Sequence, residues 1–439
     1  MVEYQQMTTA QLQDELDSLT KSHSEYTTRA LKLNMSRGKP SFEQLDSAMD
    51  LMTALPADQR PLDLDGEDTR NYGLLRGIPE ARQLMADYLG VAYGNIILGG
   101  SSSLNLMYDS IARAMSFGVA GNTPFSQQAR LKFLCPSPGY DRHFAITALF
   151  GFENIAIPMN DDGPDMNMVE RLVNQDPTVK GIWCVPKYSN PQGITYSDQV
   201  VRRFAALKPA APDFRIYWDN AYAVHDLYPD SNKADDLLSL TLACEEADNP
   251  DIWYMFASTA KISFAGGGIS ALASSTSNIA QIEALMSIQT ICPDKVNQLR
   301  HVRWFESLGG GQGKGLDGIK ARMKQLSAML APKFDIVDQV LSEDLGGCGI
   351  ASWIKPNGGY FISLEVLPGT AKRTVQLCAE AGVTLTDAGA TWPYGVDPED
   401  SNIRIAPSYP SIEELEQASR LLAVSARLAA VERLLGKGV

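Results

Sequence analysis

Seven short apolar runs, separated by stretches of helical character, are the feature that most constrains the fold of this chain. The runs lie at residues 95–98, 131–134, 154–158, 181–185, 214–218, 252–256 and 269–273. Such runs indicate buried strands, and a helix between consecutive strands is typical of parallel pairing. The pattern therefore predicts an α/β fold with a large, mainly parallel, seven-stranded sheet.

The pattern changes at a glycine cluster over residues 309–315. Beyond this cluster we expect a helix, two strands and a final helix, at residues 318–345, 358–366, 383–386 and 411–434. These elements describe a smaller α+β unit. We therefore expect a large domain over residues 51–315 and a small C-terminal domain over residues 316–439.

Composition limits the possible classes of function. The chain has 439 residues, of which 44% are hydrophobic and 21% charged, as in a soluble protein with more than one core. Its 38 basic and 52 acidic side chains give a net charge of −14, which repels phosphate backbones, so we expect no nucleic-acid partner. No apolar stretch approaches the ~20 residues that cross a bilayer, so we expect no membrane partner.

The cysteines and histidines carry no recognisable pattern. The six cysteines lack CxxC pairing and the four histidines lack metal-ligand spacing, so we predict neither disulfides nor a metal site. The N-terminal residues include acidic side chains and no long apolar run, unlike a secretory signal. We therefore expect a cytoplasmic protein.

Two motifs that each follow an apolar run indicate the chemistry. These motifs are Asp219-Asn-Ala-Tyr222 and Ser258-Thr-Ala-Lys261. Open α/β sheets bind ligands at the carboxyl ends of their strands, where these motifs are expected. A lysine amine can hold an aldehyde as a Schiff base, a carboxylate can keep a pyridine ring protonated, and a phenol can hydrogen-bond a ring hydroxyl. Together these residue types point to pyridoxal 5'-phosphate (PLP) as cofactor.

A third motif, the turn Asn190-Pro-Gln-Gly193, precedes these two. In this order and spacing the three motifs resemble the signature of the fold type I, class I aminotransferases. The likeness covers nearly the whole chain, through a glycine-proline motif, a tyrosine-glycine-arginine segment, a phosphate loop and an arginine motif, at residues 34–40, 71–82, 97–103 and 402–406. The stretches 36–40, 138–143 and 218–225 are similar to the type Ic aspartate aminotransferases.

The resemblance implies the PLP-dependent transferase fold type I, with residues 1–50 joining the small domain. It also implies that Lys261 carries the cofactor and moves the proton during the reaction. Asp219 then faces the pyridine nitrogen, while Tyr222 and Asn190 reach the ring hydroxyl. Tyr140 stacks over the cofactor ring.

The cofactor phosphate has several candidate partners. Ser258 lies three residues before the lysine, and Ser101, Ser102 and Ser103 precede a helical pattern whose N-terminus suits an anion. Which of these three serines contacts phosphate stays open. Tyr72 resembles the family tyrosine that reaches the phosphate from the neighbouring subunit, which implies a homodimer with shared active sites.

One position departs from the family pattern. Many members carry an arginine eight residues after the lysine, whereas this chain has Ile269 there. The phosphate then needs another partner. The glycine amides of 266–268, the helix after Ser103 and Lys295 are the candidates, and the sequence does not decide among them.

Substrate recognition is expected to rest on Arg404, whose guanidinium suits bidentate binding of an α-carboxylate. The Gly38 backbone is expected to approach the same carboxylate, and Asn190 also belongs to the predicted substrate-binding set. A second cation is needed for the distal carboxylate of aspartate or glutamate. The candidates are Arg37, Lys39, Arg76, Arg142 and Lys295, of which Arg37 and Lys295 lie nearest the motifs expected at the cleft.

The function expected from these features is PLP-dependent transamination, with aspartate and 2-oxoglutarate giving oxaloacetate and glutamate. The same framework also serves aromatic transamination, β-elimination or decarboxylation. A third alternative is an aminotransferase-like effector-binding protein without catalysis. The roughly 30 residues before the first motif leave no room for the DNA-binding domain that such regulators carry.

Overall fold

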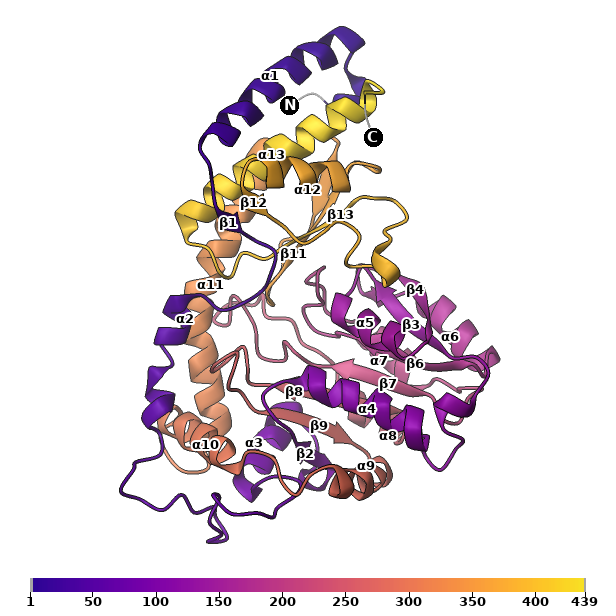
Figure 1. Ribbon diagram of the computed structural model, residues 1–439, viewed down its shortest axis with the longest axis vertical. Helices are drawn as coiled ribbons and strands as arrows, with labels where there is room; N and C mark the ends of the chain where they lie inside the picture. The colour runs from indigo at the N-terminus through magenta and orange to yellow at the C-terminus, as the bar shows by residue number, and fades with distance from the viewer. Residues whose placement is uncertain (1–2, 438–439) are drawn as a thin grey trace.

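Eight strands form the central sheet in the lower half of the molecule (Figure 1). The computed structural model describes residues 3–437. The strand order is β2-β9-β8-β7-β6-β3-β4-β5. The strands are β2 (Ile96–Leu98), β3 (Lys132–Ser137), β4 (Glu153–Asn160), β5 (Gly163–Pro164), β6 (Val179–Cys184), β7 (Arg215–Asp219), β8 (Trp253–Ser258) and β9 (Ser270–Ser274).

The predicted α/β class with a mainly parallel sheet is confirmed. Strands β4, β3, β6, β7 and β8 pair in parallel, whereas β9 runs antiparallel to both β8 and β2. All seven predicted strands are present. The eighth strand, β5, is a two-residue partner of β4 and is too short to leave an apolar pattern in the sequence.

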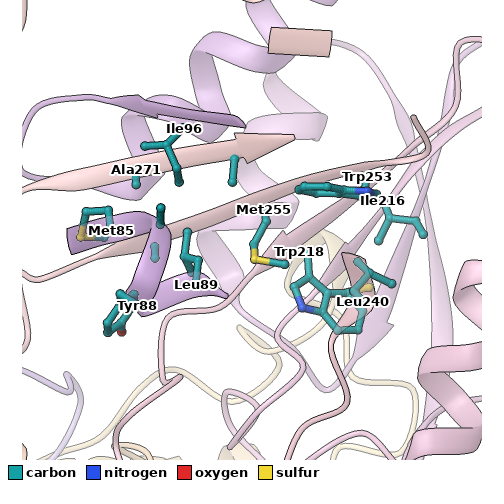
Figure 2. Close-up of a cluster of buried hydrophobic side chains, with 14 of the residues drawn as sticks. Met85, Tyr88, Leu89, Ile96, Ile216, Trp218, Leu240, Trp253, Met255 and Ala271 are labelled. Atoms are coloured by element: carbon teal, nitrogen blue, oxygen red, sulfur yellow. The ribbon is translucent and has the colours of Figure 1, made fainter. Parts of the chain in front are cut away.

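Helices cover both faces of this sheet. Side chains alternate along each strand, so Ile216 and Trp218 of β7 pack on one face and Tyr217 on the other. The first face, part of which Figure 2 shows, carries α3 (Pro79–Leu89), α6 (Met166–Gln175), α7 (Asp198–Ala205), α8 (Leu240–Glu246) and α10 (Lys295–Gly309). The opposite face carries α4 (Ser103–Phe117), α5 (Asp141–Leu149) and α9 (Thr276–Gln289). Asp219 shares the parity of Tyr217, so the sheet directs it toward the second face.

The upper unit combines the two ends of the chain (Figure 1). Its three-stranded antiparallel sheet has the order β10-β11-β13, and β1 pairs in parallel with β12. Its strands are β1 (Leu33–Asn34), β10 (Ala351–Trp353), β11 (Ile362–Val366), β12 (Val383–Thr384) and β13 (Asn402–Ile405). Its helices are α1 (Thr9–Thr28), α12 (Ala371–Glu380) and α13 (Ile412–Leu434). The α+β character expected beyond the glycine cluster is therefore present.

One long helix, α11 (Gly315–Leu345), runs through both units. Leu326 packs in the core of the large sheet, whereas Leu330 and Phe334 pack in the core of the upper unit. Pro332 lies inside this helix. The upper core also contains Leu12 from α1, which suits the expected place of the N-terminal segment, while the bounds 1–50, 51–315 and 316–439 stay a prediction.

The remaining elements are short. They are the helix α2 (Phe42–Asp46) and the 3-10 turns η1 (Tyr4–Gln6), η2 (Met49–Thr53), η3 (Tyr93–Asn95), η4 (Phe125–Gln127) and η5 (Pro393–Gly395). Over residues 3–437 no helix is both long and apolar enough to cross a bilayer. Within the same residues no group of histidine, cysteine or carboxylate side chains is arranged to hold a metal ion.

Candidate active site

A cavity of about 630 Å³ lies where the carboxyl ends of β6, β7 and β8 face the upper unit. Both units contribute side chains to its wall. The predicted site residues that line it are Arg37, Gly38, Ser102, Ser103, Tyr140, Asn190, Asp219, Tyr222, Ser258, Lys261 and Arg404. Motifs spread over most of the chain thus meet around one space.

Asp219 ends β7 with one oxygen bound and the other free. The Nε2–H of His143 donates to its Oδ2 at 3.0 Å, and the His143 ring stacks on Trp183 with centroids 4.6 Å apart. Oδ1 is buried and has no protein partner. An unpaired buried carboxylate oxygen is costly, so this atom is suited to a positively charged or N–H group of a ligand. We gave His143 no role from the sequence, where its only signal is its place in the 138–143 motif.

Lys261 follows β8 and lies partly buried in the same cavity. Its ammonium lies 5.0 Å from the centroid of the Tyr222 ring and 6.0 Å from that of Tyr360. Burial lowers the pKa of the Lys261 amine, and the nearby Asp219 carboxylate offsets part of this effect. A lysine with a lowered pKa is neutral, and therefore nucleophilic, over a wider pH range.

Tyr222 and His225 both stay neutral beside the lysine. Burial, with smaller contributions from Tyr140 and Asp219, raises the pKa of the Tyr222 phenol well above its ordinary value, so the hydroxyl remains a donor. Burial, reinforced by Lys261, lowers the pKa of His225 to about 3. Neither ring nitrogen of His225 has a protein partner. The sequence motif contained this histidine but gave no reason to single it out.

The three serines before α4 differ in what they offer the cavity. Ser102 caps the helix, because its hydroxyl accepts from the Leu104 amide at 3.2 Å. Ser102 and Ser103 line the cavity, whereas Ser101 presents its carbonyl to the Ser258 hydroxyl at 2.6 Å. The N-terminus of α4, with its free amides, therefore faces the cavity. Ser258 must release Ser101 before its hydroxyl can donate to a ligand.

Ile269, which stands where many family members carry an arginine, packs in the protein core. Ile269 is buried in the core of the large sheet, and its amide donates to the Thr259 hydroxyl at 2.9 Å. Its side chain therefore offers nothing to an anion in the cavity.

The Arg404 side chain extends from β13 into the cavity, and most of its N–H groups already have hydrogen-bond acceptors. Its Nη1 donates to Asp141 Oδ1 at 2.9 Å and to Asn190 Oδ1 at 3.3 Å. Its Nη2 donates to the Thr386 hydroxyl at 3.3 Å, and its Nε is buried without a partner. The guanidinium also lies 5.0 Å from the centroid of the Phe361 ring.

Gly38 is required by this stacking. A Cβ at position 38 would lie 2.7 Å from Cζ of Phe361, closer than real contacts allow. The absence of a side chain at Gly38 thus lets the ring lie beneath Arg404.

The candidates for a second cation divide into two groups. Arg37, Lys39 and Arg142 line the cavity, and the Lys39 ammonium lies 3.8 Å from the centroid of the Tyr409 ring. Over residues 3–437, the side chains of Arg37 and Arg142 make no hydrogen bond or ion pair with a protein group. Arg76 and Lys295 do not line the cavity.

Tyr72 and Lys295 instead meet each other away from this cavity. The Lys295 ammonium donates to the Tyr72 carbonyl at 3.2 Å, and the Tyr72 side chain is 78% exposed. Arg76 pairs with Glu283. Within a single chain, therefore, Tyr72 and Lys295 do not reach the site that the sequence assigned to them.

Comparison with known proteins decides the family. The family model described as aspartate amino-transferase matches residues 7–438. The chain belongs to this family. The resemblance inferred from the motifs is thereby confirmed, and with it the prediction of a transaminase-type enzyme.

Individual relatives agree along nearly the full length. The chain is 48% identical to a putative aminotransferase of Mycolicibacterium smegmatis over 419 residues, which cover 95% of each chain. It is 44% identical to an aspartate transaminase of Corynebacterium glutamicum, whose crystal structure superposes with a TM-score of 0.93 and covers 98% of this chain and 99% of that one. The α-aminoadipate aminotransferase LysN of Thermus thermophilus, complexed with N-(5'-phosphopyridoxyl)-L-leucine, shares the fold at 16% identity, with a TM-score of 0.71 and coverage of 93% and 95%.

Proposed function

We propose that this aminotransferase uses PLP and transfers the amino group of aspartate to 2-oxoglutarate. The observation that carries the proposal is one cavity holding a partly buried lysine of lowered pKa, a carboxylate with one unpaired oxygen and an arginine suited to a carboxylate. The Corynebacterium glutamicum relative, an aspartate transaminase, supports the choice of substrate. LysN, with its phosphopyridoxyl ligand, supports the choice of cofactor.

The residues present fit the cofactor. Asp219 Oδ1 is the acceptor for a pyridinium N–H, and the N-terminus of α4 with Ser102 and Ser103 is the anion site for a phosphate. Tyr222 and Asn190 are the donors for the ring hydroxyl. When bound, PLP supplies an electron sink that stabilises negative charge on the substrate Cα.

The chain's own residues perform the proton transfer. Arg404 holds the substrate α-carboxylate, which fixes the direction of the Cα–H bond within the cavity. The Lys261 amine, whose pKa burial lowers, takes the proton from Cα of the amino donor and delivers a proton to Cα of the amino acid that is formed. The Asp219 carboxylate, which is hydrogen-bonded to His143, would stabilise positive charge on the pyridine nitrogen of bound PLP.

We propose a homodimer in which Tyr72 and Lys295 serve the partner's cavity. Tyr72 is 78% exposed, and other large apolar side chains, including Phe42, Met52 and Ile288, are exposed as well. A dimer contact that covers such side chains would remove apolar surface from water. This arrangement accounts for two predicted site residues that lie outside the cavity of their own chain. We further propose a cytoplasmic location, in keeping with the composition.

Amino-donor specificity tests the choice of substrate. Purified protein with PLP and 2-oxoglutarate should give stoichiometric glutamate from aspartate, and aspartate should exceed alanine in kcat/KM by roughly 10- to 100-fold. One charge-assisted contact to the distal carboxylate accounts for this factor. A better rate with an aromatic amino acid or alanine would reject the aspartate assignment, and release of an unsaturated product would indicate a β-lyase.

Subunit mixing tests the shared site. Lys261→Ala and Lys295→Ala homodimers are each expected to show little activity. Mixed dimers contain one site with both lysines, so activity should appear on co-refolding. Sedimentation as a monomer, or no gain on mixing, would contradict the proposed dimer.

A further inference from the structure

Asp141 is bound to the guanidinium of Arg404, the group that we propose holds the substrate carboxylate. It is the first residue of α5, and its Oδ1 accepts from Arg404 Nη1 at 2.9 Å. The side chain of Arg404 is 7% exposed, whereas that of Asp141 is 33% exposed. The pair thus joins a buried cation to a partly hydrated anion at the cavity wall.

The physical reason for this contact lies in the cost of burying a charge. A guanidinium removed from water is unfavourable unless a counter-charge or hydrogen-bond acceptors replace the lost hydration. Asn190 and Thr386 provide neutral oxygens at 3.3 Å, so in the chain alone Asp141 supplies the only carboxylate bound to Arg404 among the described residues.

A substrate carboxylate is the same chemical group as the Asp141 side chain. Both seek the N–H donors of one guanidinium, and two carboxylates on a single positive charge leave one negative charge uncompensated. Arg404 cannot move away easily, because β13 pairs it with Ser363 of β11 and Phe361 stacks on it. Asp141 can move, since it is partly exposed and a carboxylate in the first turn of a helix is favoured by the helix dipole.

We propose that Asp141 is an internal competitor for the substrate-carboxylate site. It neutralises and holds Arg404 in the empty cavity, and it turns toward solvent when a substrate or product carboxylate binds. Every carboxylate ligand is therefore bound more weakly than Arg404 alone would allow, which favours product release. The proposal rests on the proposed function in one respect, the assignment of Arg404 to the α-carboxylate.

The test measures binding of unreactive carboxylates to the PLP-loaded enzyme by calorimetry. The probes are succinate, with two carboxylates, and propionate, with one. In Asp141→Asn both should bind about 10-fold more tightly, because a charge-assisted hydrogen bond no longer has to be broken and its value is discounted for partial exposure. Asp141→Ser is a second variant in case the asparagine amide creates a new contact.

A matched control separates competition from a general charge effect. Asp387 lines the same cavity but makes no hydrogen bond or ion pair with Arg404, so Asp387→Asn removes an equal charge and should change affinity far less. In an Arg404→Ala background, Asp141→Asn should lose its effect. Equal tightening by both aspartate variants, or tightening that persists without Arg404, would overturn the proposal.

The direction of the effect also separates competition from positioning. If Asp141 orients Arg404 for the substrate, both probes bind more weakly to Asp141→Asn, and this outcome too would overturn the proposal. Neither probe requires turnover. Tightening together with no transamination of aspartate would therefore reject the proposed function and leave this inference standing, whereas weakening in an active enzyme would do the reverse.

Discussion

The two walls of the cavity differ in how far their polar groups are already satisfied. On the wall from the large sheet, Asp219 keeps an unpaired oxygen and Lys261 lies partly buried with its amine near aromatic rings. On the wall from the upper unit, Arg404 already donates through Nη1 and Nη2 to Asp141, Asn190 and Thr386, and only its Nε lacks a partner. A polar group without a partner gains a hydrogen bond when a ligand binds, so the complex is stabilised and the ligand stays. A polar group that already has a partner must exchange it for the ligand, so the net gain is smaller. The difference matches a resident cofactor on one side and a transient substrate on the other.

Removing the Lys261 side chain from the large-sheet wall should have the largest effect on activity. Lys261→Ala should still bind PLP noncovalently through Asp219 and the α4 N-terminus, yet lose turnover by several orders of magnitude, because the other lysine of the described cavity lining, Lys39, is exposed and lies over the Tyr409 ring. Single-turnover absorbance and borohydride labelling provide the measurements. Exposed Lys324, paired with Asp230, is the control, and Lys324→Ala should keep both label and rate. Substantial turnover by Lys261→Ala would exclude it as the catalytic lysine.

Removing the charge of Asp219, whose Oδ1 has no partner, should have the next largest effect on activity. Asp219→Asn keeps the side-chain shape but removes the charge, so we expect kcat to fall about 100-fold or more with a much smaller change in KM. Steady-state kinetics at saturating PLP measure both. The control is Asp213→Asn, which breaks a buried pair with Lys180 outside the cavity and should affect stability rather than kcat. A change confined to KM would be inconsistent with the proposed role of Asp219.

Adding a side chain at Gly38, beneath Arg404, should produce a smaller effect, which falls on KM rather than on kcat. Gly38→Ala brings a Cβ to 2.7 Å from Phe361 and displaces the ring on which Arg404 stacks. Overpacking of this kind costs about 1–3 kcal/mol, so KM for aspartate should rise roughly 10-fold while kcat changes little. Gly94→Ala meets no atom within 4 Å and is the control. A loss in kcat alone would indicate that Gly38 acts on the chemical step.

The smallest predicted effect concerns pH and His225. Its pKa, lowered by burial and Lys261 to about 3, lies below the ordinary value of 6.5, so between these values the unfolded chain binds the extra proton and the folded chain does not. Stability is therefore lost as pH falls from 6.5 toward 3, by about 1.4 kcal/mol per pH unit for one proton.

The variant His225→Gln should lose this part of the pH dependence. Urea midpoints of the wild type and the variant at pH 7 and pH 5 provide the measurement, and the wild type should lose more stability than the variant as the pH falls. Parallel shifts in both proteins would mean that His225 is already protonated in the folded chain.

Much of the fold was readable from the sequence because its strands are continuous apolar runs. All seven such runs became strands, whereas β5 (Gly163–Pro164) and β10 (Ala351–Trp353) contain no run of large aliphatic residues that would mark them in the sequence. The residues at strand ends were also predictable, since Asp219 ends β7 and Lys261 lies three residues beyond the end of β8.

Contacts between distant segments were not readable in the same way. Asp141 and Arg404 are 263 positions apart, and no local pattern connects them. His143 and Phe361 likewise acquire their roles only by packing against Asp219 and Arg404. The places of Tyr72 and Lys295 depend on a second chain and remain predictions for the same reason.

The helix α11 carries a mechanical consequence. Because α11 packs in both cores, bending of this helix changes the distance between the two walls of the cavity. Pro332 has no N–H to donate to the carbonyl one turn earlier, and it lies just beyond the point where the helix passes from one core to the other. Bending of α11 near Pro332 is therefore one way in which the distance between Lys261 and Arg404 can change.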